Sequence, residues 1–242
     1  MRVAVISDIH ANYHALEAVL REVEREAPDE VWCLGDVVGY GPLPNDCVDR
    51  VRALADVCLV GNHDLAALGV LATTDFGLSA AVSARWTAAE LGEEQRAWLL
   101  GLAPQARRPG AELFHGSPRD PVWEYVLSEE VALLGLTATT EPLVLVGHSH
   151  VALAIGWDGE RVDGGLAAGG TELELRPGRR LLNPGSVGQP RDGDPRAAWL
   201  LLDLAAGRAS FRRAPYEIER TQAEIRARRL PDELAARLAH GI

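Results

Sequence analysis

The sequence contains no lysine: all 24 of its basic residues are arginine, against 35 Asp and Glu residues. The absence of lysine excludes Schiff-base chemistry and the phosphate-binding lysine of a P-loop. The formal charge of −11 is spread along the chain, and it argues against a long nucleic acid as partner, because such a partner needs a basic face. A small anionic substrate is compatible with this charge, since bound metal ions can outweigh a repulsive surface.

The chain also has few cysteines and no long apolar run. Its three cysteines form no CxxC pair, and we expect Cys33 and Cys58 to be buried, inert thiols. No apolar run is long enough to span a bilayer, and the first residues lead straight into a strand-like run rather than a signal peptide. We therefore expect a cytoplasmic protein without a membrane partner. A homo-oligomer is possible, and the sequence does not give the oligomeric state.

The first half of the chain alternates short apolar strands with amphipathic helices. We expect strands at 3–6, 31–34, 57–60, 112–115 and 143–146, and helices at 15–26, 46–54, 79–91, 93–100 and 128–136. Strands that are almost fully apolar and are joined by helices predict a partly parallel sheet with covered faces. The pattern is weak only at 65–77, which we interpret as a loop or irregular helix that serves as a lid or a dimer contact.

After residue 150 the pattern changes to strands separated by Gly-rich turns. We expect strands at 151–157, 171–176, 181–182, 197–204 and 209–213, followed by helices at 218–228 and 231–239. These strands predict a mostly antiparallel half-sheet. Together the two halves predict one domain over residues 1–242, an α/β fold that forms a four-layer α-β-β-α sandwich of two mixed sheets flanked by helices.

Five segments share one feature: each follows an apolar strand and carries side chains that can bind metal. They are Asp8-Ile9-His10, Gly35-Asp36, Gly61-Asn62-His63-Asp64, His115-Gly116 and Gly147-His148-Ser149-His150. Ligands bind beyond the carboxyl ends of strands in open α/β sheets, so these segments can converge. We attribute the alternation in Asp8-x-His10 and His148-x-His150 to extended backbone, in which residues two apart point the same way.

The types of side chain in these segments indicate which metals they would bind. Carboxylate, amide oxygen and imidazole together suit Mn, Fe, Zn, Ni or Co better than Ca²⁺ or Mg²⁺. There are too many ligands for one tetrahedral zinc ion, whereas two ions about 3.5–4 Å apart, bridged by a carboxylate, would use them all. We therefore expect two divalent metal ions as cofactors, with Mn as the first choice.

The motifs DxH, GD, GNHD, HG and GHSH, in this order between residues 8 and 150, resemble those of the calcineurin-like metallophosphoesterases. The segments GDVVGYGP at 35–42, HGSPRDPVWEY at 115–125 and NPGSVGQPRDG at 183–193 are similar to those of the small prokaryotic phosphodiesterases of that superfamily. The resemblance implies hydrolysis of a small, nucleotide-like phosphodiester or phosphomonoester by a metal-activated hydroxide. Ala11 and Ser149 depart from the commoner Gly and Thr of these motifs, and neither change removes a ligand.

The resemblance also implies a role for each residue of the motifs. One metal would be held by Asp8, His10, Asp36 and His150. The other would be held by Asp36, Asn62, His115 and His148. His63 would donate a proton to the leaving oxygen or stabilise transition-state charge, Asp64 would orient it, and Asn62 would also contact the substrate.

Three further polar residues are candidates for substrate contact. Arg119 and Arg191 could bind the non-bridging phosphate oxygens, because guanidinium fits that geometry. The alternative for each is a surface ion pair with its neighbour, Asp120 or Asp192. Asn12 could touch the substrate, although capping of the helix that follows is its expected primary role.

Two other functions are compatible with the same residues. A hydrolase of dinucleoside polyphosphates or of phosphoproteins would use every predicted ligand. A non-catalytic metal-binding scaffold would also keep the fold, but it should have lost a ligand or His63, and this sequence has lost none.

Overall fold

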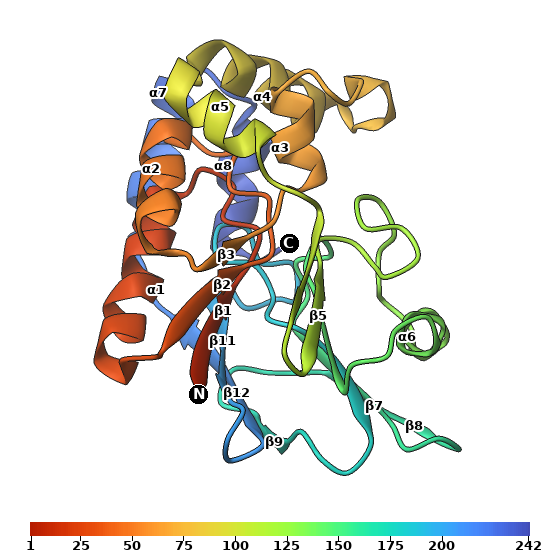
Figure 1. The fold of residues 1–242 in the computed structure, drawn as a ribbon. Coiled ribbons are helices and arrows are strands. Elements are labelled where there is room, and N and C mark those ends of the chain that lie inside the picture. The colour runs from red at the N-terminus through yellow and green to blue at the C-terminus, as the bar shows by residue number, and fades with distance from the viewer.

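The computed structural model describes residues 1–242 and contains two mixed six-stranded sheets with helices on their outer faces (Figure 1). The four-layer α/β architecture predicted from the sequence is confirmed. The first sheet has the strand order β3 (Val57–Cys58), β2 (Glu30–Cys33), β1 (Arg2–Ile6), β11 (Ala197–Asp203), β12 (Arg208–Ala214), β9 (Glu172–Glu174). In this sheet β1, β2 and β3 are parallel, and the remaining pairs are antiparallel.

The second sheet has the order β4 (Gln105–Arg108), β5 (Ala111–Phe114), β6 (Leu143–Val146), β10 (Arg179–Asn183), β7 (Leu153–Trp157), β8 (Val162–Leu166). Here β5, β6 and β10 are parallel, and the outer pairs are antiparallel. Each sheet therefore has parallel neighbours whose carboxyl ends lie at one edge, where ligand sites of α/β folds form.

The helices are α1 (Tyr13–Glu26), α2 (Pro44–Leu54), α3 (Asn62–Ala67), α4 (Leu78–Glu90), α5 (Glu93–Leu100), α6 (Glu129–Thr137), α7 (Ile218–Ala227) and α8 (Asp232–Ala236), with short 3-10 helices η1 (Thr73–Asp75) and η2 (Arg237–Ala239). The Asn12 side chain accepts a hydrogen bond from the backbone N–H of Ala15 and so caps α1, as expected. Ser128 caps α6 in the same way. No helix is both long and apolar enough to cross a membrane.

Alternation along the strands divides the core into layers. Val3 and Val5 of β1 face the second sheet, whereas Ala4 and Ile6 pack against α1 and α2 on the outer face. In β6 the residues at 143 and 145 join the core between the sheets, and those at 144 and 146 pack under α6. This alternation buries both faces of each sheet and fixes the strand ends that carry the motifs.

One prediction about the fold is wrong, and one strand was not predicted. The strands after residue 150 do not form one half-sheet, because β7, β8 and β10 extend the second sheet while β9, β11 and β12 extend the first. The prediction of mostly antiparallel pairing was correct. The pattern of apolar residues along a strand, however, does not predict which of the two sheets the strand joins. Strand β8 was not expected, since its Gly164-Gly165 pair weakens the strand pattern. The segment 65–77 holds the end of α3 and the whole of η1.

Candidate metal centre

The loops that follow the strands carry the predicted ligands in a strained backbone conformation. Five of these ligands have a positive φ: Asp8 (53°), His10 (50°), Asp36 (52°), His148 (64°) and His150 (60°). A left-handed residue other than glycine costs about 1–2 kcal/mol, so the surrounding structure must impose these turns. The expectation of extended backbone was therefore wrong, because β1 ends at Ile6 and β6 ends at Val146, before the ligands begin.

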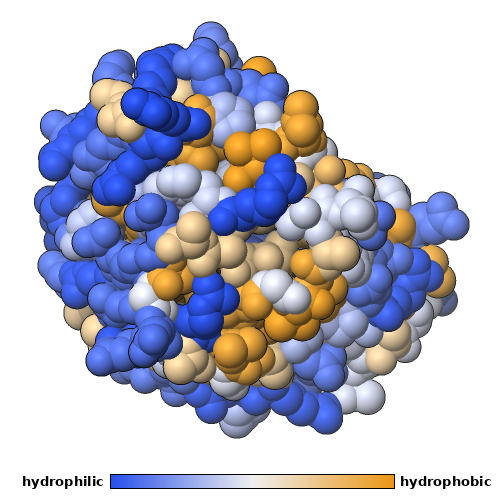
Figure 2. All heavy atoms as spheres, turned by 90° about the horizontal axis from the view of Figure 1, so that it is seen from above, coloured by the Kyte–Doolittle hydropathy of each residue, from blue (hydrophilic) through white to orange (hydrophobic).

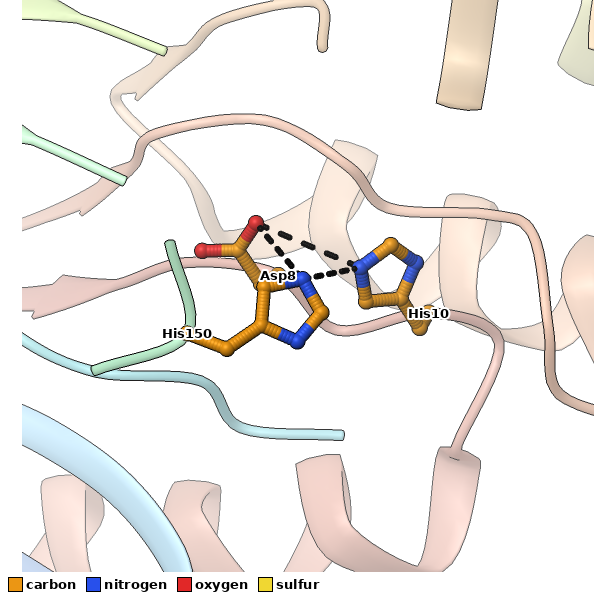
Figure 3. Close-up of side chains that lie close together, drawn as sticks. All are labelled: Asp8, His10 and His150. Carbon is orange, nitrogen blue, oxygen red and sulfur yellow. Dashed lines mark hydrogen bonds and ion pairs between the residues drawn. The ribbon is translucent and has the colours of Figure 1, made fainter. Parts of the chain in front are cut away.

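Asp8, His10 and His150 form the first cluster of potential ligands (Figure 3). The Nε2 atoms of the two histidines lie 2.9 Å apart, and Asp8 Oδ1 lies 3.6 Å from His150 Nε2 and 4.0 Å from His10 Nε2. Each histidine uses Nδ1 to donate to a backbone carbonyl, of Val38 for His10 and of Gln189 for His150. Both Nε2 lone pairs then face one point, which is favourable only when a cation lies between them.

The second cluster consists of Asp36, His115 and His148. His115 Nδ1 donates to the carbonyl of Leu34, 2.9 Å away, and its Nε2 lies 3.2 Å from Asn62 Oδ1. His148 uses Nε2 to contact the carbonyl of Trp123 at 3.2 Å, which leaves its Nδ1 as the potential ligand atom. Backbone carbonyls that fix the tautomer of a histidine are typical of metal sites.

Asp36 lies between the two clusters. Its Oδ1 accepts a hydrogen bond from the backbone N–H of His63 at 2.9 Å, whereas its Oδ2 is buried without any hydrogen-bond partner. That oxygen is 3.7 Å from His10 Nε2 in the first cluster and 3.5 Å from His115 Nε2 in the second. A buried carboxylate oxygen without a partner is costly, and a cation on each side would satisfy it.

Burial shifts the ionisation of both ligand types. It raises the pKa of Asp8 to about 7 and the pKa of Asp36 well above its usual value. It lowers the pKa of His148 to about 4, and those of His10 and His115 fall well below the usual value for the same reason. The imidazoles are thus neutral and ready to bind metal, and the carboxylates need a nearby cation to stay ionised.

His63 lies beside the clusters but its ring makes no hydrogen bond. The ring packs against Tyr40 with centroids 4.3 Å apart and meets the edge of Phe76 at 5.0 Å. Burial, and then the charge of Arg191, lower the pKa of His63 well below its usual value. Its imidazole is therefore available for a substrate rather than committed to the protein.

Asp64 does not reach the His63 ring. Its carboxylate accepts hydrogen bonds from the backbone N–H groups of Val38 at 2.9 Å and Gly61 at 3.0 Å. The side chain thus joins the loop after β2 to the start of α3. The implied orientation of His63 by Asp64 is not made through a hydrogen bond between the two side chains, since the His63 ring has no hydrogen-bond partner and the Asp64 carboxylate binds backbone N–H groups.

The two candidate arginines differ in their surroundings. Arg119 is exposed and pairs with Glu124, so the structure does not bring it to the clusters. Arg191 donates to Gln189 Oε1 at 2.8 Å and to the Tyr40 hydroxyl at 3.3 Å, and its charge acts on residues of both clusters. Neither arginine forms the ion pair with the following aspartate that was the alternative.

An aromatic rim around the clusters was not recognised from the sequence. It comprises Tyr40, Phe76, Trp123 and Tyr125. Tyr125 stacks on His148 with centroids 4.0 Å apart, and Phe76 meets Trp123 edge-on at 5.3 Å. Tyr40 lies in the segment 35–42, and Trp123 and Tyr125 lie in the segment 115–125. Their place in these motif segments was the sequence feature that could have predicted the rim. Figure 2 looks from above onto the end of the molecule with α3, α4 and α5, where hydrophobic residues lie among hydrophilic ones in the middle of the face.

Known proteins resemble this chain over most or all of its length. The profile of the calcineurin-like phosphoesterase superfamily domain matches residues 1–207. The crystal structure of a metallophosphoesterase from Sphaerobacter thermophilus is 42% identical, covers 100% of this chain and 99% of its own, and superposes with a TM-score of 0.92. An uncharacterised protein of Methanocaldococcus jannaschii is 35% identical over 99% of this chain and 98% of its own length.

A more distant relative has a named activity. The symmetrical bis(5'-nucleosyl)-tetraphosphatase of Nitrosococcus oceani is 32% identical over 142 residues. The matched region is 54% of this chain and 49% of that protein. The similarity therefore extends over about half of each chain.

Proposed function

This chain belongs to the calcineurin-like phosphoesterase superfamily and is a phosphoester hydrolase, and from that premise we propose that it hydrolyses a small, nucleotide-like phosphodiester or phosphomonoester at a dinuclear metal site. One observation carries the proposal: Asp36 Oδ2, buried and without a partner, lies between a histidine of each cluster. This is the position that a bridging carboxylate needs.

The donor set fits two divalent cations. Asp8, His10 and His150 would hold one, and His115, His148 and Asn62 the other, with Asp36 shared between them. Neutral imidazole and carboxylate ligands suit Mn, which we propose first, and also Fe, Zn, Ni or Co. When bound, the cations would polarise the phosphoryl oxygens and make water acidic enough to attack at neutral pH.

The protein's own side chains would then position the ester. Arg191 would bind non-bridging phosphate oxygens, since its charge acts on residues of both clusters and its guanidinium has no carboxylate partner. The His63 ring has no hydrogen-bond partner and can donate its N–H to the leaving oxygen. A phosphate bound beside His63 would raise the pKa of the imidazole and favour that donation. The aromatic rim would exclude water and pack on the organic group of the substrate.

A second candidate is hydrolysis of dinucleoside polyphosphates. The similarity to the Nitrosococcus oceani tetraphosphatase favours it, and every ligand would be shared with the first candidate. No observation favours a phosphoprotein substrate. A non-catalytic scaffold is disfavoured because the predicted ligands and His63 are all present and adjacent.

The proposal is tested with protein stripped by a chelator and reloaded with Mn²⁺, Co²⁺, Ni²⁺ or Zn²⁺. Turnover of an aryl phosphodiester, an aryl phosphomonoester and a dinucleoside tetraphosphate is compared. We expect stripped protein to be inactive, reloading to restore turnover, and Asp36→Asn to lose both metal and turnover. Turnover that survives stripping, or metal binding without hydrolysis of any of the three esters, would contradict the proposal.

A further inference from the structure

Two neighbouring half-buried arginines, one of them beside the first metal cluster, lack acidic partners. Arg191 follows β10 and lies beside the first cluster, its backbone N–H donating to the carbonyl of His150 at 3.1 Å. Arg237 is the first residue of η2, close to the C-terminus of the chain. Both guanidinium groups donate to one atom, Gln189 Oε1, from Arg191 at 2.8 Å and from Arg237 at 3.3 Å. Neither forms an ion pair with a carboxylate.

This pairing is unfavourable in the protein alone. Two like charges share a single neutral acceptor, and the Nε of Arg191 is buried without a hydrogen-bond partner. Burial, and then the charge of Arg191, lower the pKa of Arg237. Glu233 acts on Arg237 only at a distance too long for an ion pair. Most other arginines of this acidic chain pair with Asp or Glu, so two adjacent unpaired guanidiniums point to an anion that the protein does not supply.

Tyr40 connects Arg191 to residues of the reaction centre. The Arg191 guanidinium lies over the Tyr40 ring, 5.8 Å from its centroid, and donates to its hydroxyl. The same ring packs against His10 at 4.7 Å and His63 at 4.3 Å. A row of contacts therefore runs from Arg237 through Gln189, Arg191 and Tyr40 to His10 of the first cluster and to His63. An anion bound along this row would be close to the phosphate that is hydrolysed.

Resting on the proposed function, in which Arg191 binds the scissile phosphate, we infer that Arg237 beside it forms a second phosphate subsite, so that the preferred substrate carries another phosphate group beyond the scissile one. With two divalent cations bound, the positive charge of the cations and the two guanidiniums would exceed that of the Asp8 and Asp36 carboxylates by more than a monoanionic diester can neutralise. A phosphoanhydride chain, as in a dinucleoside polyphosphate, or a nucleoside bisphosphate supplies the missing negative charge. Guanidinium suits either, because its planar donors match phosphate oxygens.

The test compares Mn²⁺-loaded wild type with Arg237→Gln on three substrates: an aryl phosphodiester, a dinucleoside tetraphosphate and a nucleoside 3',5'-bisphosphate. We expect wild type to prefer one or both of the substrates with an extra phosphate. Arg237→Gln should lower the ratio of kcat/KM for that substrate to kcat/KM for the aryl diester at least tenfold, through KM. The substrate whose ratio falls identifies whether the extra phosphate is joined by an anhydride or an ester.

Two control variants separate binding from structure. Arg237→Lys keeps the charge and should restore part of the ratio. Arg228→Gln removes an exposed arginine of the same region, which lies 3.7 Å from Glu90, and should leave the ratio at the wild-type value. An unchanged ratio in folded Arg237→Gln, with the aryl diester still hydrolysed, would overturn the second subsite alone. No hydrolysis of any substrate by wild type would overturn the proposed function and this inference together.

Discussion

At the scale of the residue, His63 is held by packing and not by hydrogen bonds. Its ring contacts Tyr40 and Phe76, and it meets His10 edge-on at 5.0 Å. Only its backbone N–H is committed, to Asp36 Oδ1. The side chain can therefore be removed without removing a proposed ligand. This separates a proton-donating role from a metal-binding one, which the sequence could not do.

We predict that His63→Ala keeps its metal content and loses about 10²- to 10⁴-fold in kcat, the range expected for loss of a general acid. Metal per chain is measured by mass spectrometry and kcat with an aryl phosphodiester and Mn²⁺. His14→Ala is the control, because His14 pairs with Glu224 on α7 and takes part in neither cluster; it should keep both values. Wild-type kcat in His63→Ala would refute the role.

At the scale of the element, the loop before α3 passes against Asp36 with no space between them. A Cβ on Gly61 would lie 2.1 Å from Asp36 Oδ1 and 2.6 Å from His115 Cε1. The φ of Gly61 is −104°, which any residue can adopt. Glycine is required here by the close approach of two loops from neighbouring strands. In the segment 65–77, Phe76 meets the His63 ring edge-on.

We predict that Gly61→Ala displaces Asp36 and lowers both metal content and turnover at least tenfold, with about 1–3 kcal/mol lost from the free energy of unfolding. Gly77→Ala is the matched control, because a Cβ there meets nothing within 4 Å and φ is −57°. It should change turnover less than twofold. The measurements are metal analysis, chemical denaturation and aryl-ester kinetics, and equal behaviour of the two variants would rule out the proposed contact.

At the scale of the whole molecule, the site joins the two sheets. Asp8 and Asp36 follow strands of the first sheet, whereas His115 and His148 follow strands of the second. Cations bound between them would therefore tie the sheets together at one edge. Below that edge the two sheets share a continuous apolar core that includes Trp32. Metal binding should accordingly act on the stability of the entire fold.

We predict that Mn²⁺ stabilises the protein more at pH 7.5 than at pH 5.5. Burial raises the pKa of Asp8 from 3.8 to about 7, so in metal-free protein its contribution to stability is present below pH 3.8 and is lost as the pH rises through about 7. A cation must displace that proton at pH 5.5 but not at pH 7.5. For Asp8 alone the difference is about 2 kcal/mol, from about 1.4 kcal/mol per pH unit below the pKa. Asp36, whose pKa is also raised by burial, acts in the same direction.

The measurement is the shift in Tm on adding Mn²⁺ to chelator-treated protein at each pH. The lowered pKa values of His10 and His148 do not change the sign, since both imidazoles are already neutral in the fold at pH 5.5. Asp36→Asn is the control and should show little shift at either pH. Equal shifts for wild type at the two pH values would contradict the prediction.

Local periodicity in the sequence was sufficient for most of the fold. Apolar runs of four residues and helical repeats depend on near neighbours in the chain, so β1, β6 and α1 were predicted within a few residues. The assignment of later strands to one sheet or the other failed, because pairing partners are chosen by contacts between distant segments. Strand β8 shows the same limit, since its two glycines give no pattern to read.

The sequence by itself determined which side chains can bind metal, because carboxylate and imidazole chemistry and the strand before each motif are local properties. Only the tertiary structure decided how they meet. Left-handed backbone turns orient the side chains of Asp8 and His150. Asp36 keeps one carboxylate oxygen without a hydrogen-bond partner between the two clusters. Arg237, near the C-terminus, lies beside Arg191 because both donate to Gln189 Oε1. These features depend on loops from two sheets packed against each other, and no stretch of sequence contains that information.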